Sequence, residues 1–133
     1  MNFKTLEINF EDDRGIIMDI ISITDFQHAT IITSNKGTIR ADHYHKKTSQ
    51  YTFILNGRFL YISRNRNTKK VDIITLNKND LVLSPPNEDH LLFAKEDSTM
   101  LVLTCGIRGG EDYEKDTFRL NKHESLKKYL NNN

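Results

Sequence analysis

The chain has few of the features that mark secreted, membrane-spanning or metal-cluster proteins. Its 133 residues include one cysteine, Cys105, which excludes an internal disulfide and a cysteine-based metal cluster. The apolar runs are only a few residues long, far short of the roughly 20 that span a bilayer. Acidic residues near the N-terminus stand where a secretory signal would be apolar. We therefore expect a cytoplasmic protein with no membrane partner. Because Cys105 lies in an apolar segment, we expect its thiol to be buried and inert.

An excess of charge of either sign is also missing. The 19 Lys and Arg residues nearly balance the 18 Asp and Glu residues, so the formal net charge is +1. No overall field attracts nucleic acid, and we expect no nucleic-acid partner. The hydrophobic fraction of 37% indicates a packed core rather than disorder. The length fits one domain, so residues 1–133 are expected to fold as a single domain.

Most apolar segments are short, rich in β-branched residues and separated by turn residues. They cover residues 16–23, 29–33, 51–56, 58–63, 71–76, 80–83, 90–94 and 100–105. About eight or nine such segments in succession are typical of strands in a sandwich or small barrel. Asn56-Gly57 predicts a tight hairpin between two paired strands. Helical spacing appears clearly only at Leu126, Tyr129 and Leu130, which predict a short C-terminal helix packed on the barrel.

One stretch is basic without a nearby acid. Residues 63–70 contain Arg64, Arg66, Lys69 and Lys70. We expect this stretch to be a solvated hairpin tip, and a phosphate or nucleic-acid patch is the alternative.

Three of the five histidines lie where strands begin or end. His43 and His45 are two residues apart, and residues at this spacing point to the same face of a strand. Their rings either converge inside a barrel or lie on its outside. Gln50 follows at the start of the next expected strand, and a Pro85-Pro86 turn leads into His90. These residues form the candidate site.

The spacing around the histidine pair resembles the first motif of the cupin superfamily. Gly37 is followed by five residues, then by His43-Tyr44-His45, and after four more residues by Gln50. Gln50 stands where the family has Glu, and after six more residues Gly57 closes the motif. The resemblance implies an all-β, double-stranded β-helix, the jelly roll or cupin barrel, with a ligand site inside.

The second cupin motif is matched in spacing more than in residues. Asn79 and Asn87 replace the two glycines of the family, His90 is kept, and Ala94 replaces the final Asn. Asn tolerates a positive φ better than most residues, so Asn87 can serve a turn that favours Gly.

Two groups of nucleotide-sugar enzymes within this superfamily share further residues with the chain. The segment from Arg40 to Gln50 resembles the Arg-Gly-x-His-Ala-His-Lys-x-x-x-Gln pattern of the dTDP-4-keto-6-deoxyhexose 3,4-ketoisomerases, with Ala41 in the Gly position. The segment 112–118 resembles their C-terminal Asp-Tyr-rich segment. Asp13-Arg14-Gly15 resembles the opening of dTDP-4-dehydrorhamnose 3,5-epimerases. The resemblance implies a homodimeric isomerase or epimerase of nucleotide sugars, in surface-polysaccharide or deoxysugar biosynthesis, with no required cofactor.

The resemblance also implies roles for individual residues. His43 would remove a proton next to a 4-keto group, and His45 or a nearby tyrosine would return one. The substrate-binding candidates are Arg40, Lys46, Gln50, Tyr51, Arg58 and His90. Arg40 lies three residues before His43, so in a regular strand it points away from the site. A bulge near Ala41 is required to bring it inside.

Two other functions remain open. In a metal-dependent cupin enzyme, His43, His45, Gln50 and His90 would hold a divalent metal, although a neutral Gln50 offsets none of its charge. In a non-catalytic cupin, the same cavity would only bind a sugar.

Overall fold

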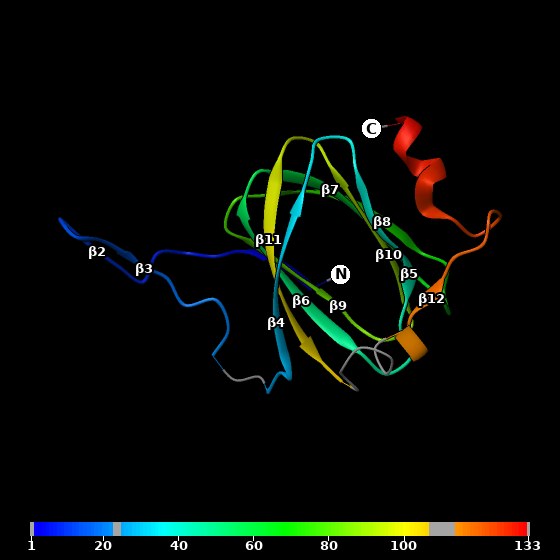
Figure 1. Cartoon of the computed structure of the whole chain (residues 1–133), viewed down its shortest axis with the longest axis horizontal. Helices are drawn as coiled ribbons and strands as arrows, with labels where there is room; N and C mark the ends of the chain where they lie inside the picture. The colour runs from blue at the N-terminus through cyan, green and yellow to red at the C-terminus, as the bar shows by residue number, and fades with distance from the viewer. Residues whose placement is uncertain (1, 23–24, 107–113, 133) are drawn as a thin grey trace.

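The computed structural model describes residues 2–22, 25–106 and 114–132, which form two facing five-stranded antiparallel sheets and a separate hairpin (Figure 1). The first sheet has the order β1 (Asn2–Thr5), β9 (Asp80–Ser84), β6 (Ser49–Asn56), β11 (Ser98–Cys105), β4 (His28–Ser34). The second has the order β12 (Phe118–Arg119), β5 (Ile39–Tyr44), β10 (Glu88–Ala94), β7 (Arg58–Asn65), β8 (Val71–Asn77). This arrangement is the expected jelly roll.

The core lies between the two sheets and draws on both. Its buried side chains are Ile54, Phe59, Tyr61, Leu76, Val82, Leu92, Ala94, Met100 and Val102. They come from β6, β9 and β11 of one sheet and from β7, β8 and β10 of the other. Burying the apolar face of each sheet against the other supplies the main driving force for this fold.

The prediction of a hairpin at Asn56-Gly57 is wrong. β6 pairs with β9 and β11, whereas β7 pairs with β8 and β10, so this turn carries the chain from one sheet to the other. Gly57 has a φ of 90°, and a Cβ there would meet the Ser98 side chain at 2.1 Å. The glycine therefore serves a close crossing between sheets.

The basic stretch at residues 63–70 does form the turn of the β7–β8 hairpin. The expectation of a fully solvated tip is wrong, because Arg64 is buried and Arg66 is partly buried. Both arginines form ion pairs with Asp89, which lies on the neighbouring strand β10. Sequence proximity could not reveal an acid that lies more than 20 residues away.

The C-terminal segment covers the outer face of the second sheet. A 3-10 helix, η1 (Leu126–Asn132), stands where the sequence predicts a short helix. Leu126 is fully buried against Leu60, Ile62 and Leu91. This packing fixes the segment onto β7 and β10.

A hairpin of β2 (Phe10–Asp12) and β3 (Gly15–Ile17) extends away from the two sheets (Figure 1). Its strands pair only with each other among the described residues. Phe10, Ile16 and Ile17 are all exposed on it. No helix of the described residues is long and apolar enough to cross a membrane.

Candidate active site

Three histidine rings meet between the two sheets. His43 lies on β5, His45 directly after it, and His90 on β10, where it is the register partner of His43. The His43 ring centroid is 4.7 Å from that of His45 and 4.8 Å from that of His90. The alternation of strand residues predicts the first contact, and the pairing of β5 with β10 supplies the second.

The bulge required near Ala41 is present. The pairing of β5 with β10 shifts by one residue between His90 and Leu91, and Ala41 and Asp42 have φ values of 71° and 62°. Asp42 is the extra residue of this bulge. Beyond it, Arg40 pairs with Leu92, a residue of the core between the sheets. The arginine thus lies on the same inner face as the histidines.

A cavity of about 130 Å³ opens beside the histidines. Its polar lining consists of Arg40, His43, Gln50, Thr52, Ser84 and His90. Its apolar lining consists of Ile32, Ala41, Leu92, Met100 and Val102. Arg40 is the exposed residue of this lining at the cavity mouth, where its Nε donates to Ser34 Oγ at 3.0 Å and its Nη2 donates to the carbonyl of Thr33 at 2.6 Å. Its Nη1 has no protein partner among the described residues, so it remains available to a ligand.

Backbone carbonyls fix the tautomers of two rings. His45 Nδ1 lies 2.8 Å from the carbonyl oxygen of Asp116, and His90 Nδ1 lies 3.2 Å from that of Glu88. A carbonyl oxygen only accepts, so each Nδ1 carries a proton. In the neutral rings, the Nε2 atoms therefore carry the lone pairs.

Two rings of the cluster, His43 and His90, are uncharged near neutral pH. Burial, followed by repulsion from His90 and His45, lowers the pKa of His43 to about 2. Burial also lowers the pKa of His90 to about 4, with His45 as the next cause. Neutral imidazoles are the form that accepts a proton or binds a metal.

Asp116 anchors His45, and the sequence indicated this only through a resemblance of segment 112–118. Of that segment, Asp112 and Tyr113 lie outside the described residues. The Asp116 carboxylate accepts hydrogen bonds from the backbone N–H groups of Lys46, Lys47 and Thr48 and from the Thr48 hydroxyl. These bonds lower the pKa of Asp116 against the opposing effect of burial. One residue thus holds both the His45 ring and the loop that follows it.

A buried tyrosine lies behind the cavity. The Tyr61 hydroxyl and Ser84 Oγ are 2.7 Å apart, and Ser84 lines the cavity. Burial raises the pKa of Tyr61 well above its usual range, so its hydroxyl stays protonated. No sequence pattern pointed to this link between Tyr61 and the cavity.

Three of the predicted substrate-binding residues lie apart from the cavity lining among the described residues. Lys46 lies over the Phe118 ring, with Nζ 4.5 Å from its centroid. Tyr51 stands between Gln50 and Thr52, whose side chains line the cavity, so its own side chain points to the opposite face. Arg58 begins β7 at the end opposite to His90 and pairs with Glu96 at 3.6 Å.

Cys105 differs in part from expectation. It is partly exposed rather than buried, and its thiol donates to the carbonyl oxygen of Asp25 at 3.0 Å. Partial burial, and then the nearby Asp25 charge, raise the pKa of the thiol. A raised pKa makes a thiolate scarce and agrees with an unreactive cysteine.

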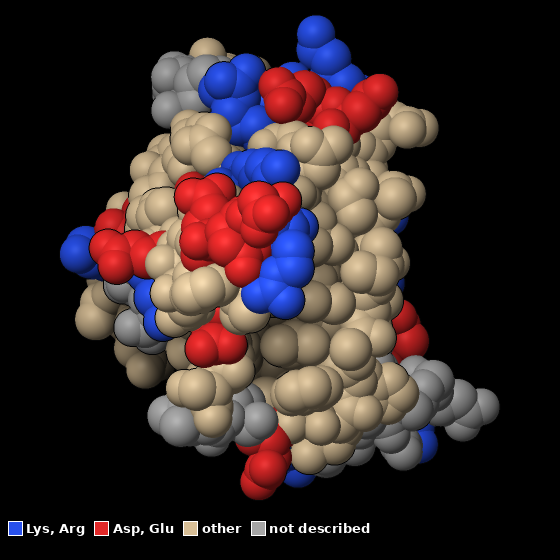
Figure 2. Space-filling model, turned by 90° about the vertical axis from the view of Figure 1, so that its left-hand side faces the viewer, with Lys and Arg blue, Asp and Glu red and all other residues tan. Residues whose placement is uncertain are grey.

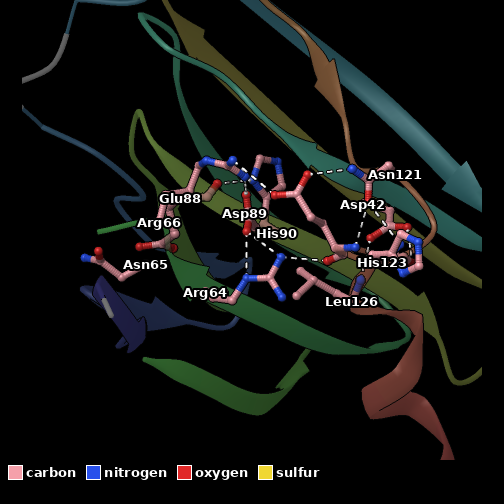
Figure 3. A network of polar contacts seen from close by, with 12 residues as sticks. Asp42, Arg64, Asn65, Arg66, Glu88, Asp89, His90, Asn121, His123 and Leu126 are labelled. Atoms are coloured by element: carbon pink, nitrogen blue, oxygen red, sulfur yellow. Dashed lines mark hydrogen bonds and ion pairs between the residues drawn. The ribbon is translucent and has the colours of Figure 1, made fainter. Parts of the chain in front are cut away.

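A charged network lies on the outer face directly behind the histidines (Figure 3). Asp89 is buried between Arg64, at 2.8 Å, and Arg66, at 2.6 Å. Arg64 also donates to the carbonyl oxygen of Glu124, and Arg66 contacts the Glu124 carboxylate at 3.3 Å. This network ties β7 and β10 to the C-terminal segment.

Solved structures of nucleotide-sugar enzymes resemble this chain, although it matches no model of a protein family and no curated protein. A double variant of the QdtA 3,4-ketoisomerase from Thermoanaerobacterium thermosaccharolyticum, in complex with TDP, is 26% identical, with 97% of each chain covered and a TM-score of 0.72. The dTDP-4-dehydrorhamnose 3,5-epimerase from Sulfolobus tokodaii is 19% identical, with 93% of this chain and 85% of that chain covered and a TM-score of 0.73. ChmJ, a 3'-monoepimerase from Streptomyces bikiniensis in complex with dTDP-quinovose, is 14% identical, with 90% and 69% covered and a TM-score of 0.76. The chain thus has the cupin jelly-roll fold that these epimerases and ketoisomerases share.

Proposed function

We propose that the protein is a nucleotide-sugar isomerase or epimerase that moves a proton next to a 4-keto group, in deoxysugar or surface-polysaccharide biosynthesis. The observation that carries this proposal is that neutral His43 and His90 line one cavity with Arg40, while the buried His45 ring packs against His43. Similar structures carry TDP or dTDP-quinovose, which supports a ligand of this class.

His43 acts as the base in this proposal. It lines the cavity, and its lowered pKa leaves the ring neutral at working pH. The same burial makes it a weak base without substrate. The negative charge that develops on the sugar oxygen as the proton leaves lies next to the ring, which raises the pKa of His43 and favours proton transfer from the sugar carbon.

The enediolate formed by proton loss needs a donor that is already in place. Arg40 supplies one, because Ser34 and Thr33 hold its guanidinium at the cavity mouth. Return of the proton to the neighbouring carbon completes an isomerisation, and return to the opposite face of the same carbon completes an epimerisation. His45 and Tyr61 are the candidates for the group that returns it.

The size of the cavity suits part of the substrate. Its volume of about 130 Å³ is well below the roughly 300–1,000 Å³ of sites that enclose a drug-sized ligand. The sugar therefore occupies the cavity, and the nucleoside diphosphate lies outside the mouth. The chemistry uses side chains alone, so no cofactor is required.

Proton exchange tests the proposal directly. Chelator-treated protein is incubated with dTDP-4-keto-6-deoxyglucose in heavy water, and the ring protons are followed by NMR. We expect exchange at C3 or C5, and its position names the carbon that loses the proton. His43→Ala should abolish the exchange while dTDP binding is retained, whereas His123→Ala, at an exposed site, should leave it intact. Exchange that survives in His43→Ala removes His43 as the base.

A metal-dependent reaction is the second candidate, and one observation favours it. Each of the three histidines offers one ring nitrogen, and these three nitrogens lie within 4.8 Å of one another. Neutral imidazoles suit Zn²⁺ or Ni²⁺, and the three rings would hold the ion with Gln50 nearby. Activity that appears only when divalent metal is added back to chelated protein would replace the first proposal with this one.

We also propose that the protein is a homodimer joined by the β2–β3 hairpin. An isolated two-stranded hairpin is marginal in water, and Phe10 and Ile17 are register partners that both lie exposed on one face. Acidic side chains gather beside basic ones at the centre of the face that includes the hairpin (Figure 2). In the hairpin sequence, charged residues 11–14 lie between the apolar residues Phe10 and Ile16.

A second copy of the chain offers a matching surface. Strand β4 is the last strand of its sheet, and Ile31 on it is exposed. The hairpin of one copy would cover this edge on the other, and two-fold symmetry would make the contact twice. Sedimentation equilibrium should give a dimer for the native chain and a monomer for Phe10→Ser/Ile17→Ser. A native chain that is monomeric, or a variant that stays dimeric, contradicts this assembly.

A further inference from the structure

The bulge beside His43 is held by residues from the far end of the chain. Asp42 accepts a hydrogen bond from Ser125 Oγ at 2.7 Å and another from the backbone N–H of Leu126 at 2.9 Å. Its carbonyl oxygen accepts a third, from the backbone N–H of Leu120, at 3.1 Å. Figure 3 shows Asp42 beside the start of η1. The C-terminal segment is itself fixed, because Leu126 is fully buried.

The bulge needs this support because its backbone is unfavourable. Ala41 and Asp42 both have positive φ, a region that residues other than Gly rarely occupy. Asp tolerates it better than most residues, but Ala has no side chain that could form a compensating hydrogen bond. The conformation therefore persists because surrounding contacts determine it.

The bulge decides which face Arg40 occupies. With Asp42 as the extra residue, Ala41 pairs with Leu91 and Arg40 pairs with Leu92, on the inner face. A regular strand continuing from the His43–His90 pair would place Ala41 opposite Leu92 and Arg40 opposite Phe93. Phe93 packs with Leu126 on the outer face, so a regular strand would carry the guanidinium out of the cavity.

We propose that Asp42 is a positioning residue: by clamping the bulge to the C-terminal segment, it holds Arg40 in the cavity. This inference rests on the proposed function only for its effect on turnover. The placement of Arg40 can be measured without substrate, so the two can fail separately.

Asp80 provides a matched control. Its carboxylate also accepts one hydrogen bond from a hydroxyl, that of Thr5 at 2.6 Å, and one from a backbone N–H, that of Asn77 at 2.7 Å. Asp80 itself begins β9 of the first sheet. Asp42→Ala and Asp80→Ala therefore remove the same kinds of bond. Only Asp42→Ala should displace Arg40.

The first measurement is the NMR signal of the Arg40 Nε–H group, which donates to Ser34 Oγ. In Asp42→Ala we expect this signal to shift and its exchange with water to speed up, whereas Asp80→Ala should retain the native signal. In the turnover assay, Asp42→Ala should lower kcat on the order of a hundredfold while dTDP binding is kept, as expected for a misplaced catalytic donor.

Rescue separates positioning from general destabilisation. Ala41→Gly makes the positive φ favourable, so Asp42→Ala/Ala41→Gly should recover the Arg40 signal and most of the turnover. Ser125→Ala, which removes one bond only, provides a milder variant if Asp42→Ala does not fold. The clamp is overturned if the Arg40 signal is unchanged in both Asp42→Ala and Ser125→Ala. It is also overturned if Asp42→Ala/Ala41→Gly recovers neither the Arg40 signal nor turnover. Absence of turnover in the native chain counts against the proposed function alone, because the Arg40 signal still decides the clamp.

Discussion

The two faces of the sheet that contains β5 and β10 differ in charge, although neighbouring residues supply both. On the inner face, His43 and His90 are neutral and their rings lie against each other. On the outer face, Asp89 forms two buried ion pairs with Arg64 and Arg66. Asp89 and His90 are consecutive residues of β10, so one side chain lies in the charged outer network and the next in the neutral inner cavity.

This difference in charge suits the inner face to chemistry and the outer face to stabilising the fold. His43 and His90 stay neutral, and so can accept a proton, because no carboxylate of the described cavity lining raises their pKa. These neutral rings give their strands little electrostatic attraction. The outer ion pairs supply that attraction, since removing one partner of a buried, well-aligned ion pair strongly lowers the stability of the fold. We therefore expect outer variants to change stability and inner variants to change chemistry and pH response.

The largest expected effect is on the outer face. Asp89→Ala leaves two largely buried guanidinium groups without their carboxylate, which should lower the free energy of unfolding by about 3–5 kcal/mol. Glu96→Ala, which breaks the exposed pair with Arg58, is the control and should cost no more than about 1 kcal/mol. Urea denaturation measures both. Equal losses would mean that the outer network holds the sheet no better than a surface pair.

The second effect tests the inner face through pH. Because the folded protein lowers the pKa of His90 to about 4, the unfolded chain binds more protons between pH 6.5 and 4. Stability is therefore present above about pH 6.5 and falls as the pH drops towards 4, by an amount on the order of 3 kcal/mol for His90. His43 adds to this loss in the same direction, since its pKa is also lowered.

A variant that lacks only the His90 ring isolates the contribution of His90. His90→Gln should lose part of the decline in unfolding free energy between pH 7 and 4.5, while His123→Gln should keep all of it. Burial raises the pKa of Glu88, which works in the opposite direction at the low end of this range. The comparison of His90→Gln with the native chain cancels that contribution. Identical slopes for native protein and His90→Gln would show that His90 is not buried as a neutral ring.

The sequence could predict the inner face better than the outer one. Strand alternation places His43 and His45 together, and the Asn tolerance for positive φ predicts the turn at Asn87, whose φ is 61°. These features depend on neighbours in the sequence. The role of Asp89 depends on partners on β7 and in the C-terminal segment, so no local pattern could reveal it.

Two further cases show where local signals fail. Asn56-Gly57 has the residues of a hairpin turn, but the pairing of β6 with β9 and β11 decides that the chain crosses between sheets. The bulge at Ala41 and Asp42 carries no glycine, and bonds from Ser125 and Leu126 hold it. In both cases contacts distant in sequence override the local preference.

The smallest effect concerns the aromatic contact between the two regions. Tyr44 lies between His43 and His45 in sequence but points outward, where the Arg66 guanidinium lies 3.8 Å from its ring centroid and the Phe118 ring stacks at 5.2 Å. Tyr44→Leu should lower the free energy of unfolding by about 1–2 kcal/mol and leave the heavy-water exchange rate unchanged. Phe118→Leu, which removes the stacking partner but keeps Tyr44 under Arg66, should cost less. A large drop in exchange for Tyr44→Leu would mean that the outer face also controls the chemistry, because the rings of His43 and His45 would then depend on the residue between them.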